Sequence, residues 1–416
     1  MTAPPINIES PESTHGLRRG EFVVLMSLVS ATIAISIDTV LPAFDEIEAE
    51  FGLDPDGGLI SLTITVFLAA MGVGMLIWGP LSDRFGRKPV MFATLAMFIA
   101  GAMVSTLASS FAMFLVGRVI WGVAAAGPRA VGLAVIRDSY TGDLMSRIMS
   151  LTSAVFLLVP VVAPGVGEIM LTLGSWRLTT AVGAGLGVIV LVWLIRINET
   201  LQPDNMIPLE FGRLTRAGRE VITHRRTVLF TIATTMAYGA FFPWLGSSIQ
   251  MFDEIYDRGG QFALLFGANA VLMALAILAT ERMVNRFSTS PVVLVTSIAT
   301  VAMATIYVLT ALSSDGAPSF WLWFTLASIL TALSAATSPL TQTMSMESMG
   351  HIAGMASSVT GAFVFIVGAV LGGVIDRFIV DTVTPFGVGF FIYGVIGLAA
   401  IVAARAPESS GRATDA

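Results

Sequence analysis

Long apolar runs recur along the whole chain. Stretches of about 20 mostly apolar residues, enough for a helix to cross the hydrocarbon core of a bilayer, alternate with polar or Gly/Pro breaks. In the first half these runs lie near 22–43, 59–80, 90–108, 112–135, 147–171 and 178–196. In the second half they lie near 228–251, 262–281, 291–312, 319–341, 353–376 and 385–404. Because a spanning segment must satisfy its own backbone, the pattern predicts an all-α membrane protein with twelve transmembrane helices.

The composition fits a chain that is surrounded by lipid. Only 12% of the residues are charged, whereas a soluble domain carries roughly 25%. The chain has no cysteine, which excludes disulfides and thiolate metal sites. His15, His224 and His351 are scattered over tail or loop positions. We therefore expect no metal site and no cofactor.

The polar segments divide the chain into five parts. We expect a disordered cytoplasmic tail (1–20), a first six-helix half (21–197), a cytoplasmic linker (198–227), a second six-helix half (228–404) and a cytoplasmic C-terminal tail (405–416). The linker is the longest polar stretch inside the chain and carries five arginines.

The basic residues predict the orientation. With the N-terminus inside the cell, the only ones of the 22 Lys and Arg residues on the outside are Arg177, Arg258 and Arg377. Two more, Arg118 and Arg129, fall within a span. Basic residues concentrate in cytoplasmic loops, so both termini are expected to be cytoplasmic.

The two halves carry traces of a repeat. Asp83-Arg84-Phe85, with Pro89-Val90 after it, follows the second span. Asn285-Arg286-Phe287, with Pro291-Val292 after it, follows the eighth. The offset is 202 residues in each case. Two like halves around a midplane site are common in secondary transporters.

Three motifs resemble those of the major facilitator superfamily. They are Gly79-x-x-x-Asp83-Arg84-x-Gly86-Arg87-Lys88 after span 2, Gly117-Arg118-x-x-x-Gly122 in span 4 and Pro160-x-x-x-Pro164-Gly165-x-Gly167 in span 5. The last is similar to a motif of drug/proton antiporters. Finer features resemble the Bcr/CflA drug-resistance branch: Asp38-Thr-Val-Leu-Pro42, Ile136-Arg137-Asp138, Trp176-Arg177 and Ala353-Gly354-Met-Ala356-Ser357-Ser358. Glu168 and Trp121 depart from the expected glycine and glutamine.

The resemblance implies a fold and a set of partners. It implies two pseudo-symmetric six-helix halves, in the bacterial cytoplasmic (inner) membrane. It also implies proton-coupled efflux of small amphipathic or toxic compounds. The expected partners are a small-molecule substrate, protons and the lipid bilayer, with no nucleic acid, and the expected state is a monomer. A narrow-specificity metabolite exporter or importer of the same fold is the alternative.

Ionisable residues inside spans are costly and point to function. Asp38 in span 1 and Arg118 in span 4 lie ~8 and ~9 Å below the outer surface at 1.5 Å per residue. We therefore predict that they face each other and form a proton-coupling or substrate pair, with a purely structural pair as the alternative. Arg129 lies on the same helical stripe as Arg118 and either attracts an anionic group or snorkels to the inner interface. Glu168 is interpreted as a wet interfacial carboxylate, with a proton site as the alternative.

The loop after span 2 predicts a cytoplasmic gate. Its members are Gly79, Asp83, Arg84, Gly86 and Arg87, with Asp138 at the end of span 4. Asp83 would accept donors at a helix N-terminus of the second half, and Arg87 would pair with Asp138. Both contacts are expected to break on inward opening. Topology signalling by the basic residues is the alternative, above all for Arg84 and Lys88.

Spans 5 and 7 supply the remaining candidates. Pro160 and Pro164 are expected to bend span 5, while Gly165 and Gly167 permit close helix packing, as an outer hinge. In span 7 the pocket candidates are Tyr238, Phe241, Phe242 and Trp244. Asn269 and Gln342 are further polar candidates.

The sequence argues against ATP-driven transport and against an enzyme. The only lysine, Lys88, precedes Pro89, so the lysine-containing ATP-binding loop is absent. An ion gradient is the remaining drive, and the buried carboxylate favours protons. We find no His-Glu-x-x-His motif, paired intramembrane aspartates or Ser-His set, so an enzyme is not expected. A transport-like sensor is a further alternative, without a signalling domain to support it.

Overall fold

The computed structural model describes residues 15–54, 57–206 and 211–405. Within these ranges, twelve helices are long and apolar enough to cross a membrane. They are α1 (Arg19–Asp38), α3 (Leu62–Phe85), α4 (Arg87–Thr106), α5 (Phe111–Ser139), α6 (Gly142–Leu173), α7 (Arg177–Leu194), α9 (Arg225–Gln250), α10 (Phe262–Phe287), α11 (Thr289–Leu312), α12 (Phe320–Met346), α13 (Ala353–Asp376) and α14 (Thr384–Arg405). The predicted all-α fold is confirmed.

Short helices decorate the ends of the bundle. The turn η1 (Leu41–Ala43) and the helix α2 (Phe44–Phe51) follow α1, and the π-helical turn η4 (Met251–Ile255) continues α9. The expected linker contains a further helix, α8 (Phe211–Thr223). The linker is therefore partly helical.

The expected tail is ordered from His15 onward. His15 is fully buried, and its ring stacks on Phe22 with 4.2 Å between centroids. Its Nε2 lies 2.8 Å from the Tyr140 hydroxyl, and its Nδ1 accepts from the Leu17 amide. The sequence prediction was wrong for 15–20 because ring contacts and hydrogen bonds of His15 anchor this short segment. Residues 1–14 lie outside the described ranges.

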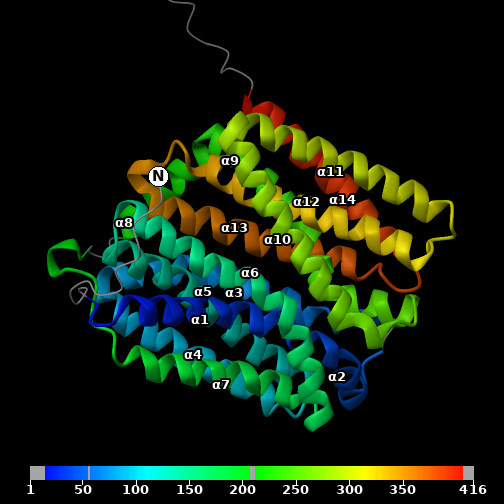
Figure 1. Ribbon diagram of the computed structural model, residues 1–416, viewed down its shortest axis with the longest axis horizontal. Coiled ribbons are helices and arrows are strands. Elements are labelled where there is room, and N and C mark those ends of the chain that lie inside the picture. Colours follow the sequence, from blue (N-terminus) through cyan, green and yellow to red (C-terminus); the bar gives the residue numbers. More distant parts are fainter. Residues whose placement is uncertain (1–14, 55–56, 207–210, 406–416) are drawn as a thin grey trace, which may run out of the picture.

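The chain folds into two bundles of six long helices. In Figure 1 the first half, α1 to α7, occupies the lower left and the second half, α9 to α14, the upper right. The start of α1 and the end of α14 lie toward the same end of the bundle, on the left and upper left. An even number of crossings brings both termini to one side.

The repeat is visible in the backbone. Gly86 joins α3 to α4 with φ +99° and ψ 155°, and Ser288 joins α10 to α11 with φ +65° and ψ 165°. The two residues are 202 positions apart, the offset seen in the sequence. Positive φ is uncommon outside glycine, so its recurrence in Ser288 indicates an equivalent turn in the two halves.

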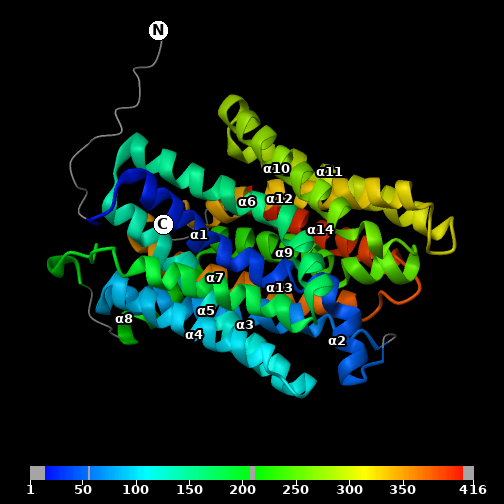
Figure 2. The ribbon, with the colours of Figure 1, turned by 60° about the horizontal axis from the view of Figure 1, so that its bottom comes forward.

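Two helix pairs provide most of the packing between the halves. α3 packs on α13 and α6 packs on α10, and both pairs are adjacent in Figures 1 and 2. Small residues permit the approach. A Cβ added at Gly72 of α3 would lie 3.0 Å from the Ala362 carbonyl of α13. A Cβ added at Gly267 of α10 would lie 2.8 Å from the Val161 carbonyl of α6.

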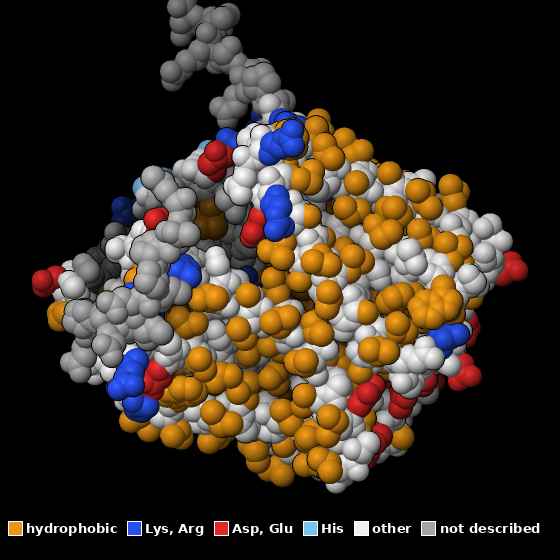
Figure 3. Space-filling model, viewed as in Figure 1, with side chains coloured by type: hydrophobic (Ala, Val, Ile, Leu, Met, Phe, Trp, Pro, Cys, Tyr) orange, Lys and Arg blue, Asp and Glu red, His pale blue; other side chains and the backbone are white. Residues whose placement is uncertain are grey.

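The outer surface of the bundle is apolar. Figure 3 shows hydrophobic side chains across the middle of the visible face, with charged groups gathered toward its two ends. A wide apolar face of this kind is expected where lipid is the solvent.

Candidate functional site

Arg118 is the most deeply buried charge of the first half. Its side chain is fully buried, and the guanidinium lies 4.4 Å from the Phe67 ring centroid and 5.1 Å from that of Trp121. Nη1 donates to the Ser36 carbonyl at 2.7 Å and Nε to the Thr63 carbonyl at 3.1 Å. Ser36 belongs to the last turn of α1, where carbonyls lack intrahelical partners. Arg118 therefore ties α5 to the end of α1 and to α3.

The Asp38 carboxyl lies in the same region without a partner. It is 3% exposed at the last residue of α1. Among the described residues, no hydrogen bond or ion pair reaches its carboxyl, and no ion pair joins it to Arg118. The predicted direct pairing was wrong because Arg118 binds the α1 backbone two residues earlier. The two residues do lie at the same end of α1, as expected from their depth.

α6 connects the Asp38 region to the second half. A Cβ at Gly167 would lie 2.3 Å from the carbonyl of Thr39, the residue after Asp38. The next residue, Glu168, accepts a hydrogen bond from the Ala263 amide in the first turn of α10 at 3.3 Å. Helix N-termini favour anions. The unexpected Glu168 therefore lies in a contact between the halves.

The hinge residues of α6 have different surroundings. Pro160 and Pro164 lie within the helix, which continues from Gly142 to Leu173. Gly167 packs closely, as predicted. A Cβ at Gly165 would meet nothing within 4 Å, so close packing at Gly165 was wrong: this glycine faces away from the neighbouring helices.

The predicted gate residues gather at the turn between α3 and α4. Arg87 donates from Nη1 to Asp83 at 2.5 Å and from Nε to Asp138 at 2.9 Å. Arg84 is exposed. A Cβ at Gly79 would lie 3.2 Å from the Ser358 hydroxyl of α13. The predicted Arg87–Asp138 pair is therefore present.

A different acid caps the helix at this turn. Glu199 accepts from the amides of Arg87 and Lys88, at 2.9 and 3.0 Å, and caps the start of α4. Any Cβ at Gly86 would come within 2.5 Å of the Glu199 carboxylate. Sequence reasoning missed Glu199, although an acid after the sixth span was visible. Binding of Asp83 to a helix N-terminus of the second half stays a prediction.

A large cavity opens between the halves. Its volume is about 1060 Å³, and Figure 3 shows the surface hollowed at the upper left, toward the end where both termini lie. Its walls include Arg129 and Arg137 of α5, Gln342 of α12 and Ser357 of α13. Arg129 and Gln342, both candidates from the sequence, line it. The Arg87–Asp138 pair is made while this cavity is open, so its predicted loss on opening was wrong: both residues belong to the first half.

The aromatic candidates of α9 lie elsewhere. Tyr238 and Phe242 pack on Phe365 of α13, with ring centroids 5.5 and 5.8 Å away. Trp244 is 1% exposed and stacks on Phe266 in the core of the second half. None of these three, nor Phe241, lines the large cavity. In this state the α9 rings therefore pack helices together.

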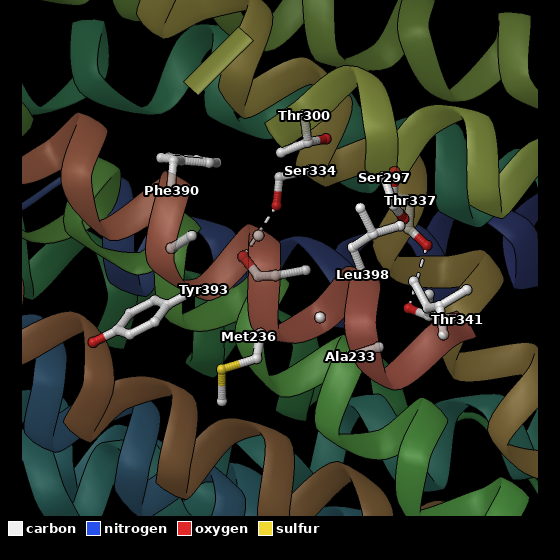
Figure 4. Close-up of a pocket in the computed structure, with 15 residues that line it drawn as sticks. Ala233, Met236, Ser297, Thr300, Ser334, Thr337, Thr341, Phe390, Tyr393 and Leu398 are labelled. Carbon is white, nitrogen blue, oxygen red and sulfur yellow. Dashed lines mark hydrogen bonds between the residues drawn. The ribbon is translucent and has the colours of Figure 1, made fainter. Parts of the chain in front are cut away.

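Smaller cavities lie within the second half. One of about 40 Å³ lies between α9, α11, α12 and α14 (Figure 4). Ser334 donates to the Ala237 carbonyl beside it, and Thr234 donates to Thr341. This volume suits about one water. Asn269 lines another, of about 190 Å³, and donates to Thr331.

A second buried aspartate was missed. Asp376 ends α13, is 2% exposed, and accepts a hydrogen bond from the Ser247 hydroxyl at 2.6 Å. Asp376 is the last residue of the span predicted at 353–376, so the signal that singled out Asp38, an ionisable residue within a predicted span, was also present here. Asp376 differs from Asp38 in having a hydroxyl donor.

Known proteins match both the sequence and the fold. The profile described as Major Facilitator Superfamily matches residues 26–253. The bicyclomycin resistance protein homolog of Haemophilus influenzae is 27% identical over 88% of this chain and 91% of its own length. The multidrug resistance protein MdtL of Salmonella typhimurium is 29% identical over 61% of each chain. The crystal structure of a D-xylose-proton symporter superposes with a TM-score of 0.75, covers 94% of this chain and 99% of its own, and is 13% identical.

Proposed function

Because the chain belongs to the major facilitator superfamily, we propose that it exports small amphipathic or toxic compounds in exchange for protons. Relatives that are named for bicyclomycin and multidrug resistance support export of such compounds. On this proposal the chain is a transporter and not an enzyme. Its partners are a small-molecule substrate, protons and lipid, and it works as a monomer.

The uncompensated burial of Asp38 carries the proposal. A charged carboxylate in an apolar interior is very costly without a cation or hydrogen-bond donors, so the neutral, protonated form is the one that fits. The guanidinium of Arg118 donates hydrogen bonds to two backbone carbonyls and forms no ion pair with Asp38, so Asp38 has no counterion there. Asp38 therefore holds a proton in this state and is the residue through which transport is coupled to the proton gradient.

The two ends of the molecule differ in the way that alternating access requires: a cavity is open between the halves at one end, and the halves are in contact at the other. The cavity is open at the end with the termini, which we assign to the cytoplasm of a bacterial cell, with the protein in the inner membrane. The opposite end is closed where α6 meets α10. Gly167 and Glu168 are consecutive residues of α6 and contact Thr39 and α10, respectively. Loss of the proton at Asp38 would thus disturb the helix end on which the outer contact rests.

Reconstitution into proteoliposomes tests this function. With an acidic lumen, transporters in the inside-out orientation should accumulate substrate in the lumen as protons leave. A panel of cationic, neutral and anionic compounds identifies the substrates. Asp38→Asn should abolish uphill accumulation but keep downhill exchange. The exposed Asp315→Asn is the matched control and should behave as wild type. Accumulation that ignores the gradient, or survives in Asp38→Asn, would refute the proposal.

A further inference from the structure

The central cavity carries unbalanced positive charge. Its charged lining residues are Arg129, Arg137, Arg226 and Glu347. Arg226 donates to Glu347 at 2.6 Å, so these two neutralise each other. Arg129 and Arg137 are exposed to the cavity, and no described residue forms a hydrogen bond or ion pair with either guanidinium. The cavity therefore presents two unpaired arginines and no unpaired acid.

The two arginines share one face of α5. Arg129, Leu133 and Arg137 follow each other at four-residue spacing, which aligns side chains on one side of a helix. Eight residues correspond to ~12 Å along the axis. Arg137 lies in the last turn of α5, where a basic residue also serves topology. Arg129 lies two turns further in, so topology does not account for it.

The rest of the lining suits an apolar body with polar edges. Ala126 of α5, Met75 of α3 and Gly361 of α13 line the cavity beyond Arg129. Flexible methionine side chains adapt to varied apolar shapes. Gln342 and Thr343 of α12 add neutral hydrogen-bonding groups. An apolar region thus lies beside a free guanidinium.

The chemistry selects the sign of the ligand. A guanidinium binds carboxylate-like anions through two parallel hydrogen bonds, and a cleft lined by one sign of charge concentrates ions of the other sign. A cationic compound would meet two unpaired positive charges here. Resting on the export function proposed above, we infer that this cavity binds amphipathic compounds with a carboxylate or sulfonate group. The acidic group of the ligand binds the Arg129 guanidinium, and its apolar body lies toward Met75 and Ala126.

Equilibrium binding of a matched pair of probes tests the inference. 1-Pyrenebutyrate and 1-pyrenebutyramide share one aromatic body and differ in charge. Their affinities are measured by fluorescence with purified protein in a non-ionic detergent at pH 7.5. A hydrogen bond to a charged group predicts that the acid binds roughly tenfold or more tightly than the amide. Added salt should narrow this ratio, because screening weakens exposed charges.

Variants assign the preference to Arg129. In Arg129→Gln the affinities for the acid and the amide should differ by no more than about twofold. Arg129→Lys should keep part of the preference for the acid, because lysine keeps the positive charge but lacks the paired N–H donors of the guanidinium. The matched control is Arg282→Gln, an exposed arginine of α10 outside the cavity, which should keep the full preference. Thermal unfolding checks that each variant is folded.

Two results would overturn the inference. The first is a wild-type protein that binds the amide as tightly as the acid, which decides the question even if a variant does not fold. The second is an Arg129→Gln variant that keeps the acid preference. Binding of the two probes to the wild-type protein needs no gradient, so it is measured independently of transport. If gradient-driven transport fails but the protein still binds the acid more tightly than the amide, the result refutes proton-coupled export and leaves the inference about the cavity standing.

Discussion

The guanidinium of Arg118 joins three helices at one point. Arg118→Lys keeps a positive charge, but one ammonium cannot reproduce a fork that spans the carbonyls of Ser36 and Thr63. We expect a loss of stability of about 1–3 kcal/mol, the usual cost of leaving a buried polar group unsatisfied. Thermal unfolding in detergent measures it. Arg129→Lys makes the same exchange at an exposed site of the same helix and should leave Tm unchanged. Equal effects at both sites would contradict the assigned contacts.

His15 predicts a pH dependence of stability. Burial lowers the pKa of His15 to about 4, whereas the unfolded chain has a histidine pKa near 6.5. Between these values the unfolded state binds a proton that the folded state does not, so stability falls as the pH falls from about 6.5 toward 4. Above pH 6.5 this contribution to the pH dependence vanishes.

Melting temperatures at pH 7.5 and pH 5 check this prediction. The Tm of wild type should fall further from pH 7.5 to pH 5 than the Tm of His15→Gln, which has no ionisable group at this position. His351→Gln removes an exposed histidine at the same end and should keep the wild-type loss. Identical pH profiles for wild type and His15→Gln would show that His15 is not buried in its neutral form.

At the scale of elements, α6 touches both the Asp38 region and the second half. Removing the Glu168 carboxylate leaves the Ala263 amide without its partner, so Glu168→Ala should favour opening of the end that is closed here. A carboxylate at a helix N-terminus contributes about 0.3–1 kcal/mol, which predicts a population shift of a few-fold.

The absence of cysteine makes this shift measurable with spin labels. Ser109→Cys with Ser313→Cys reports the closed end, and Ser146→Cys with Ser348→Cys reports the open end. Glu168→Ala should lengthen the first distance distribution and shorten the second. Glu281→Ala, an exposed acid on α10, should change neither. Unchanged distances in Glu168→Ala would mean that the Glu168–Ala263 contact does not hold the ends together.

The elements were more predictable than their side-chain contacts. Hydrophobic length alone located all twelve spans, because lipid imposes that length on every helix. Depth along the axis placed Asp38 and Arg118 at one level, but it does not fix rotation. Ser36 and Asp38 point about 160° apart at 100° per residue, and Arg118 meets the backbone of the former. The α9 rings were misassigned because composition does not distinguish a cavity wall from a helix–helix contact. Gly368 and Gly372 of α13 leave room for that contact, since a Cβ at either position would meet Phe242 of α9.

At the scale of the whole molecule, a cavity open at one end and a closed contact at the other describe one state of an alternating-access cycle. Three carboxyls are buried at the closed end of the described chain: Asp38 and Glu48 in the first half and Asp376 in the second. Among the described residues, Asp376 has a hydroxyl donor, Ser247, and Glu48 lies on the short helix α2 beyond the end of α1. We therefore assign the transported proton to Asp38. Substrate binding should therefore displace a proton from Asp38, whichever compound is carried.

Proton release on substrate binding tests this claim most directly. Substrate is added to purified protein in a weakly buffered solution that contains a pH indicator dye. We expect release of about one proton per bound substrate in wild type and in Asp376→Asn, and none in Asp38→Asn at matched occupancy. Release that persists in Asp38→Asn, or disappears in Asp376→Asn instead, would contradict it.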